Sequence, residues 1–222
     1  MKKMLLLIPV LSLGSSAWAM SGTCTSGTLA QYDASGFSCT LGDLTFSDFS
    51  YVPADSGGAT APPDSGVTVT PVTSGFGTET GLLFTAAWLV GMGQSEDSSI
   101  SYEVSTTNPG GITDLSLVVV GGAAGLGIAS VAETTVTPPE SLFTEFANGT
   151  DIPTASATFA PVGSIDVTKD IGLSGGTAPG GAHISDVYNL FSEGTTVPEP
   201  SMVFLCTGLL GLLPIARRKF GR

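Results

Sequence analysis

The stretch Ser99-Ile100-Ser101-Tyr102-Glu103-Val104-Ser105 decides the fold. Apolar and polar side chains alternate through it, so Ile100, Tyr102 and Val104 share one face while serines and a glutamate occupy the other. A period of two is that of a β-strand with one buried and one exposed face. The stretch therefore predicts a strand that covers one side of a core.

Other short stretches of the body, which is the chain between residues 20 and 194, follow the same rule. Residues 67–70 alternate valine and threonine up to Pro71, where we expect the strand to end. Residues 44–46 and 49–51 alternate in opposite phase, and this slip near Ser47-Asp48 is typical of a β-bulge. The remaining strand candidates are residues 81–90, 115–120, 127–133, 157–162, 164–168 and 182–190.

Clusters of glycine, proline and asparagine separate these strands, as turns require. They lie at residues 55–64, 108–111, 138–139, 148–149 and 174–181. Many short strands at this spacing predict one all-β domain over residues 20–194, an antiparallel β-sandwich or jelly roll. Within that domain, only residues 140–148 are considered for a helix. Helices are expected in an N-terminal signal and in a short C-terminal membrane segment.

The first 19 residues have the parts of an export signal. Lys2 and Lys3 precede the apolar residues 4–13, and Ala17 and Ala19 are small residues at the positions that signal peptidase reads. We expect signal peptidase to cleave after Ala19, which sends the body out through the inner membrane.

The body is strongly acidic. Between residues 20 and 196, Lys169 is the only basic residue, against eighteen acidic residues. This excludes nucleic acid as a partner, because such binding depends on Lys and Arg that neutralise phosphates. Two interpretations stay open, namely solubility in a saline exterior and cation binding. Calcium is the ion that acidic loops favour, although the sequence contains no ordered calcium loop, and no cofactor is otherwise expected.

The C-terminal tail has three parts. A linker at residues 195–200 ends in Pro198-Glu199-Pro200, an apolar segment covers residues 201–216, and residues 217–222 begin with Arg217-Arg218-Lys219. As a helix, the apolar segment would be roughly 24 Å long, shorter than the ~30 Å hydrocarbon core of a membrane. The basic end should stay in the cytoplasm, so the body faces outward. Such a marginal span suits a temporary anchor.

These three parts together resemble the PEP-CTERM sorting signal of Gram-negative bacteria, which is also catalogued as the ice-binding protein C-terminal domain. The resemblance implies that an exosortase, a membrane-embedded cysteine transpeptidase, recognises Pro198, Glu199 and Pro200. Arg217, Arg218 and Lys219 would be the membrane stop. The resemblance also implies release to the cell surface or an exopolysaccharide matrix, often in biofilm-forming species. A plain tail-anchored membrane protein is the alternative.

Two cysteines near the start of the body predict a disulfide. Cys24 and Cys39 lie fifteen residues apart on the exported side, where disulfides persist. Such a bridge contributes about 3 kcal/mol in the chain-entropy model. We expect it to hold a Gly- and Ser-rich segment that lacks packing of its own, and two free thiols are the alternative.

The sequence nominates no catalytic residue and no metal ligand. His183 is the only histidine and lies beside Ser185 and Asp186, but a catalytic triad depends on tertiary geometry, so a strand histidine is expected. Glu96-Asp97, expected in a polar turn at residues 94–99, could serve a glycosidase only at a defined carboxyl separation.

Sugar binding would use exposed aromatic side chains. The candidates are Tyr51, Trp88, Tyr102 and Tyr188, of which Trp88 is expected in the core because it lies in an apolar run. Ice binding would need long ranks of threonine, whereas Thr68 and Thr70 form only an isolated pair.

The favoured function is that of an exosortase-sorted protein of the cell surface or extracellular matrix, with a non-enzymatic structural or adhesive role. The alternative is a module that binds carbohydrate, above all exopolysaccharide. A glycan-active hydrolase and an ice-binding protein are less favoured.

Overall fold

A computed structural model describes residues 21–73, 79–147, 149–177 and 179–195. The signal segment at residues 1–19, the Pro-Glu-Pro motif, the apolar segment at residues 201–216 and the basic residues 217–222 lie outside the described residues. They therefore stay predictions. Within the described ranges, no helix has both the length and the apolar character needed to cross a membrane.

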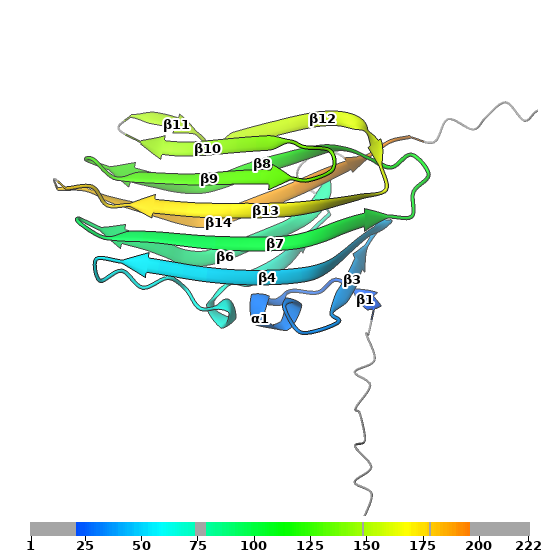
Figure 1. The fold of residues 1–222 in the computed structure, drawn as a ribbon, viewed down its shortest axis with the longest axis horizontal. Helices are drawn as coiled ribbons and strands as arrows, with labels where there is room; N and C mark the ends of the chain where they lie inside the picture. Colours follow the sequence, from blue (N-terminus) through cyan, green and yellow to red (C-terminus); the bar gives the residue numbers. More distant parts are fainter. Residues whose placement is uncertain (1–20, 74–78, 148, 178, 196–222) are drawn as a thin grey trace, which may run out of the picture.

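Two β-sheets lie face to face, as the alternation predicts (Figure 1). The eight-stranded sheet has the order β1-β3-β4-β7-β13-β9-β10-β11, and the six-stranded sheet the order β12-β8-β14-β6-β5-β2. Neighbouring strands are antiparallel apart from β1 and β3. The all-β sandwich is confirmed.

The strand bounds of the eight-stranded sheet are β1 Ser21–Thr23, β3 Ser38–Leu41, β4 Leu44–Ser56, β7 Ser95–Thr106, β13 Ser164–Ser174, β9 Ile128–Thr135, β10 Ser141–Ala147 and β11 Thr150–Ile152. Those of the six-stranded sheet are β12 Thr154–Val162, β8 Ile112–Ala124, β14 Gly181–Glu193, β6 Thr80–Gly91, β5 Thr68–Val72 and β2 Gly27–Thr28.

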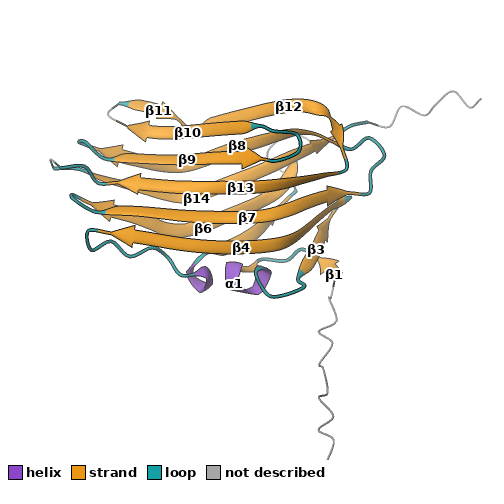
Figure 2. Ribbon diagram, in the orientation of Figure 1, coloured by secondary structure: helices purple, strands orange, loops and turns teal. Residues whose placement is uncertain are grey.

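Helix is confined to one short turn of each kind in the described ranges, α1 at Leu29–Tyr32 and the 3-10 turn at Asp64–Gly66 (Figure 2). A helix was expected over residues 140–148, but Ser141–Ala147 form the strand β10, so that interpretation was wrong. Leu142, Thr144 and Phe146 are buried while Phe143 is exposed, which is the period of a strand and not of a helix.

The predicted bulge in β4 is confirmed. The pairing of β4 with β7 shifts between Ser47 and Ser50, and Asp48 has a φ of 54°. The predicted strand end at Pro71 is wrong, because β5 continues to Val72. Pro71 is tolerated there because the neighbouring strand β2 pairs only with Thr68 and Val69, which leaves Pro71 on a free edge.

Aromatic rings join the two sheets at the centre of the core. Phe46 and Tyr102 come from the eight-stranded sheet, and Phe84 and Phe191 from the six-stranded sheet. Phe46 lies 6.1 Å from Phe191 between ring centroids, and Phe84 lies 5.8 Å from Tyr102. Full burial of each such ring contributes roughly 1.5–3 kcal/mol, so these contacts hold the sheets together.

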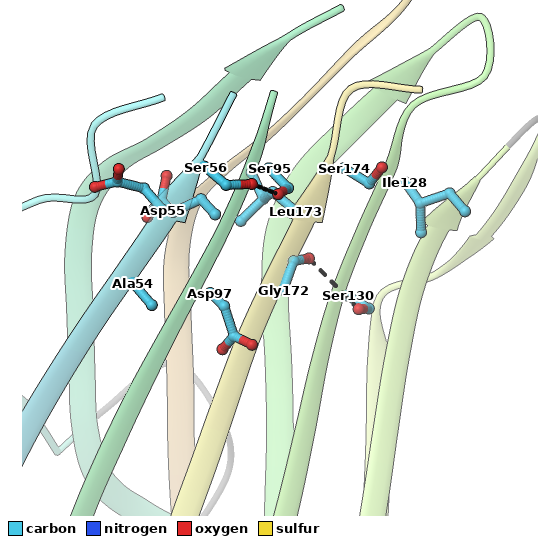
Figure 3. Close-up of a pocket in the computed structure, with 11 residues that line it drawn as sticks. Ala54, Asp55, Ser56, Ser95, Asp97, Ile128, Ser130, Gly172, Leu173 and Ser174 are labelled. Carbon is cyan, nitrogen blue, oxygen red and sulfur yellow. Dashed lines mark hydrogen bonds between the residues drawn. The ribbon is translucent and has the colours of Figure 1, made fainter. Parts of the chain in front are cut away.

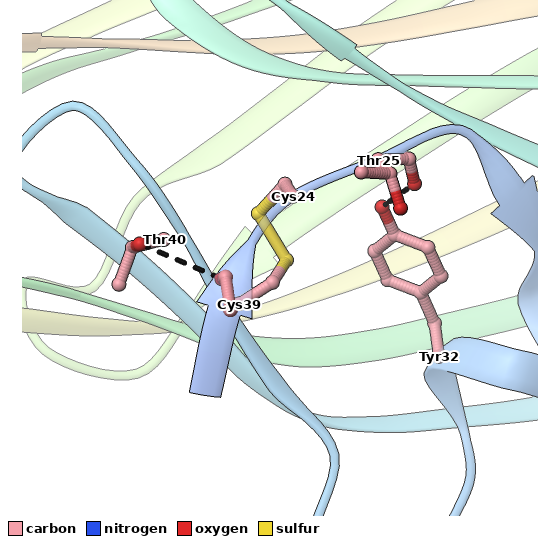
Figure 4. Close-up of a disulfide and its surroundings, with 6 residues drawn as sticks. Cys24, Thr25, Tyr32, Cys39 and Thr40 are labelled. Carbon is pink, nitrogen blue, oxygen red and sulfur yellow. Dashed lines mark hydrogen bonds between the residues drawn. A yellow bond between two sulfur atoms is a disulfide. The ribbon is translucent and has the colours of Figure 1, made fainter. Parts of the chain in front are cut away.

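The disulfide between Cys24 and Cys39 is confirmed (Figure 4). The segment it closes is nevertheless packed, contrary to the expectation. Leu29 is fully buried, and the Tyr32 ring lies 4.6 Å from Phe37 between centroids. The Tyr32 hydroxyl donates to the Thr25 carbonyl at 2.8 Å, so the bridge reinforces a small cluster that already has its own contacts.

One charged pair lies inside this core. Lys169, the only basic residue of the body, points inward from β13 and is fully buried. Its neighbour in the pairing of β13 with β9 is Glu133, also fully buried, and the two form an ion pair. Burying two charges is costly unless their remaining hydrogen bonds are satisfied, so the neighbours of this pair are of interest.

Candidate binding site

The outer face of the eight-stranded sheet is covered by small polar side chains. The pairing of its strands places one row of hydroxyls across five neighbouring strands: Ser50, Ser101, Thr168, Thr134 and Ser141. Within this row, the Ser101 and Thr168 hydroxyls are 3.1 Å apart and hydrogen-bonded. None of these side chains is large, so this row offers closely spaced hydrogen-bonding groups.

A pocket of about 450 Å³ opens at one end of this face (Figure 3). Strands β4, β7, β13 and β9 each contribute residues to it. Its floor contains Gly172 and Ser130, which pair with each other across β13 and β9. A methyl group at Gly172 would meet only the Ser130 hydroxyl, at 3.5 Å, so small side chains create the hollow. The lining residues are Ala54, Asp55, Ser56, Ser95, Glu96, Asp97, Ile128, Ser130, Gly172, Leu173 and Ser174.

The polar groups of the pocket are held by the sheet. The hydroxyls of Ser56 and Ser95 are 2.7 Å apart and hydrogen-bonded, and Ser130 donates to the Gly172 carbonyl at 3.4 Å. The Asp55 carboxylate accepts from the Ala61 backbone at 3.2 Å. Because Asp55 pairs with the inward-pointing Glu96, its carboxylate lies on the inner side of the sheet. Serine hydroxyls and the Asp97 carboxylate therefore converge on one hollow from rigid strands.

A second carboxyl group stands beside the pocket on the same face. Asp170 is two residues from Gly172 on β13, and its neighbour on β7 is Ser99, two residues from Asp97. A hydrogen bond with Asp97, partial burial and the charge of Asp97 raise the pKa of Asp170 to about 6. Asp170 therefore keeps its proton to a higher pH than an isolated aspartate does.

Glu96 does not lie in a polar turn, as the sequence suggested. Strand β7 already begins at Ser95, so Glu96 points inward and is 2% exposed. Burial raises the pKa of its carboxyl to about 7. Ser98 donates to Oε1 at 3.4 Å, while Oε2 has no hydrogen-bond partner among the described residues.

The aromatic side chains expected to bind sugar do not line the pocket. Trp88 is fully buried, as expected, and Tyr102 is 2% exposed within the core. Tyr51 is half-buried and donates to the Pro62 carbonyl at 2.8 Å. Tyr188 is half-buried on β14 of the other sheet.

Sequence reasoning missed the aromatic side chain that the outer face does expose. Phe143 is 49% exposed on β10. Strand pairing places it in one row with Ala132 and Asp170. The alternation of Leu142, Thr144 and Phe146, which all point inward, could have revealed it had the segment been read as a strand.

His183 is exposed on β14, with Leu89 and Gly122 as its strand partners. Its neighbour Asp186 accepts hydrogen bonds from Ser185 at 2.8 Å and from Thr85 at 2.9 Å. Across the described ranges, no hydrogen bond links His183 to these groups. In the same part of the chain, no group of three or more His, Cys, Asp or Glu side chains is placed to hold a metal ion.

No family model matches the chain, and no curated protein matches it. A solved carbohydrate-binding module, TmCBM61 in complex with beta-1,4-galactotriose, is similar with 16% identity and a TM-score of 0.34, covering 63% of this chain and 86% of that one. The enzymatically active domain of bacteriophage CBA120 tailspike protein 4 is similar with 13% identity and a TM-score of 0.32, covering 64% of this chain and 19% of that one. Both TM-scores are too low to carry an argument about function.

Proposed function

We propose that the body is a non-catalytic module that binds a neutral extracellular polysaccharide in the pocket of the eight-stranded sheet. The observation that supports this is the convergence of serine hydroxyls from four neighbouring strands, together with the Asp97 carboxylate, on one open hollow of about 450 Å³. Sugars present vicinal hydroxyls, which donate to carboxylates and exchange hydrogen bonds with serine. Strands hold these groups in place before binding, which lowers the entropic cost of association.

The charge of the pocket favours neutral sugars over acidic ones. Asp97 lines the hollow and Asp170 stands beside it, whereas Lys169, the only lysine or arginine of the body, is buried on the opposite face of β13. Uronate or sulfate groups would meet like charges without a compensating cation. Phe143 adds an exposed ring two strands from Asp170, on which the apolar face of a sugar can stack.

The carboxyl geometry does not favour hydrolysis. A retaining glycosidase holds its two carboxyl groups about 5–5.5 Å apart, and an inverting one about 6.5–9.5 Å apart. Hydrogen bonding with Asp97 raises the pKa of Asp170, so the two carboxyl groups act on each other and not from opposite sides of a glycosidic bond.

The proposal is tested by filling the pocket. Gly172→Leu places a bulky side chain on the floor, where the structure has open space. Thr168→Leu is the matched control, four residues earlier on the same face of β13. Affinity electrophoresis through gels that contain neutral polysaccharides should show retardation of the parent and of the control, and at least a tenfold loss in Gly172→Leu. Equal retardation of all three proteins would contradict the proposal, as would no retardation of the parent by any gel.

A structural role without a bound ligand is the second candidate. The observation that favours it is the burial of Trp88 and Tyr102, which removes two of the expected sugar-stacking platforms. The same affinity electrophoresis distinguishes the two candidate functions, since a purely structural protein would migrate unretarded through every gel that contains a neutral polysaccharide.

The proposed route to the polysaccharide rests on the sequence of the two ends. Alanines at Pro198, Glu199 and Pro200 should leave a full-length tail in the membrane fraction, because exosortase would no longer recognise the chain. Alanines at Thr195 and Thr196 serve as the control and should leave processing intact. Unchanged processing and surface release of the first variant would refute the sorting proposal without touching the binding proposal.

A further inference from the structure

Four polar side chains meet in the middle of the core, between the two sheets. Lys169 comes from β13, Glu133 from β9 and Tyr102 from β7, all in the eight-stranded sheet. Asn189 comes from β14 in the six-stranded sheet. Tyr102 is 2% exposed and the other three are fully buried.

The amine of Lys169 lies against the side-chain amide of Asn189. Its Nζ donates to the Glu133 carboxylate and, at 2.5 Å, to Asn189 Oδ1. The carbonyl bond adds at most about 1.2 Å, so Nζ is no more than about 3.7 Å from the amide carbon. That is close to the separation of about 3–3.5 Å from which nucleophiles attack.

The other contacts of Asn189 polarise its amide. The Tyr102 hydroxyl donates to Oδ1, so the carbonyl oxygen accepts from two donors. On the other side, Nδ2 donates to Glu133 Oε1 at 3.0 Å and to the Ser116 carbonyl at 3.4 Å. Glu133 thus contacts both the amine that could attack and the nitrogen that could leave.

The surroundings favour the uncharged forms of the amine and the acid. The rings of Tyr102 and Phe84 lie 5.3 and 6.0 Å from Nζ. Burial lowers the pKa of Lys169 and raises the pKa of Glu133, although each partner opposes the shift of the other. A proton that moves from Lys169 to Glu133 removes both charges from the core and leaves a nucleophilic amine.

We propose that the folded protein joins Lys169 to Asn189 through an isopeptide bond between the two sheets. The Lys169 nitrogen attacks the amide carbon of Asn189, and the Tyr102 hydroxyl stabilises the oxyanion that forms. Glu133 passes its proton to the Asn189 nitrogen and takes one from the Lys169 nitrogen. The bond from carbon to Nδ2 breaks, ammonia leaves, and the carbonyl reforms. Nothing is oxidised or reduced, and no co-reactant is consumed.

The bond would hold the two sheets together against a force applied at the C-terminal end of the domain. It links β13 of one sheet to β14 of the other across twenty residues. Strand β14 is the last strand of the described residues and leads directly to the C-terminal linker. A pull on that end would therefore reach both sheets through covalent bonds.

The direct test is the intact mass of the folded, reduced full chain. We expect the parent to be lighter than its sequence by one ammonia molecule, and tandem mass spectrometry of a digest to show a branched peptide joining Lys169 to Asn189. Asn189→Ala and Glu133→Gln should have the full mass of their sequences. A folded parent of full sequence mass would overturn the proposal.

Asn148-Gly149 provides the necessary control, because cyclisation of an asparagine before glycine also releases ammonia. Asn148→Gln should keep the mass deficit if the isopeptide bond is its source. A deficit that disappears in this variant and persists in Asn189→Ala would overturn the proposal.

Trypsin gives a second readout that needs no folded variant. Lys169 is the only lysine or arginine between Lys3 and Arg217, so it is the only tryptic site of the body. In reduced and denatured parent protein, an amidated Lys169 should not be cleaved and the body should run as one band. The Lys169→Arg variant has no side-chain amine to form the bond, so trypsin should cut its body into two fragments. Complete cleavage of the parent at this site would count against the bond.

Discussion

Asp97 on β7 and Asp170 on β13 lie diagonally across neighbouring strands on the outer face of the eight-stranded sheet, because Asp97 pairs with Gly172 and Asp170 with Ser99. Hydrogen bonding with Asp97, partial burial and the charge of Asp97 raise the pKa of Asp170 from its ordinary value of 3.8 to about 6. The folded state thus holds a proton more tightly than the unfolded chain. The pair stabilises the protein at low pH, and that contribution is lost as the pH rises through about 6.

Asp97→Asn should remove this pH dependence. The free energy of unfolding of the variant should exceed that of the parent at pH 7.5 and approach it below pH 4. We expect a gain under about 1 kcal/mol, because Asp170 is exposed and water screens its charge. Urea unfolding at both pH values measures it. Asp166→Asn, on the same face of β13, is the control, and an equal gain there would show that only net charge matters.

Glu96→Gln should stabilise the protein more strongly. Glu96 is buried, and its folded pKa of about 7 lies above its ordinary value of 4.5, so its contribution to stability is lost as the pH rises through about 7. At pH 8 the buried charge costs up to about 3 kcal/mol, which the neutral amide avoids. The urea midpoint of the variant should rise at pH 8 and match that of the parent near pH 4. Glu103→Gln on the same strand should not show this difference, and a parent whose stability is flat between pH 4 and 8 would disprove the explanation.

Removal of the disulfide should cost about 3 kcal/mol, because the bridge between Cys24 and Cys39 restricts a loop of fifteen residues in the unfolded chain. The variant with serine at both positions should unfold at a lower urea concentration. Leu29 and Tyr32 should stay buried, so near-ultraviolet circular dichroism of the folded variant should resemble that of the parent. Both thiols open to alkylation in unreduced parent protein would show that the bridge does not form.

Gly175→Ala should be among the most destabilising single substitutions in the turns that join the strands. A Cβ atom at Gly175 would lie 1.7 Å from the Gly91 carbonyl oxygen, so the backbone of one turn would have to move. We expect a loss of at least about 2 kcal/mol in thermal or urea unfolding. Gly172→Ala, three residues earlier with open space above it, is the matched control and should stay within about 0.5 kcal/mol. Equal stability of the two variants would show that the turns are not closely packed.

Local patterns predicted much of the fold. The alternation around Tyr102 placed a strand correctly, the phase change near Asp48 located the bulge, and the two exported cysteines predicted their bridge. These features depend on neighbours within a few residues. The failures at residues 140–148 and at Pro71 have the same origin, since the pairing partners of β10 and β5 decided them.

The pocket could not be read from the sequence. Asp97, Gly172 and Ser130 are ordinary residues until strand pairing makes them neighbours. Glu96 was placed in a turn because its segment is polar, whereas the sheet continues through it and buries its side chain.

The sequence by itself determined an acidic β-rich body with a single basic residue, because composition and a period of two need no knowledge of the fold. Only the tertiary structure decided where that residue goes. Glu133 and Lys169 lie on neighbouring strands of the eight-stranded sheet, and Asn189 lies on the six-stranded sheet. Strand pairing brings the first two together, and the packing of one sheet on the other brings the third. No local pattern records this packing, since it follows from the hydrophobic burial of the whole domain.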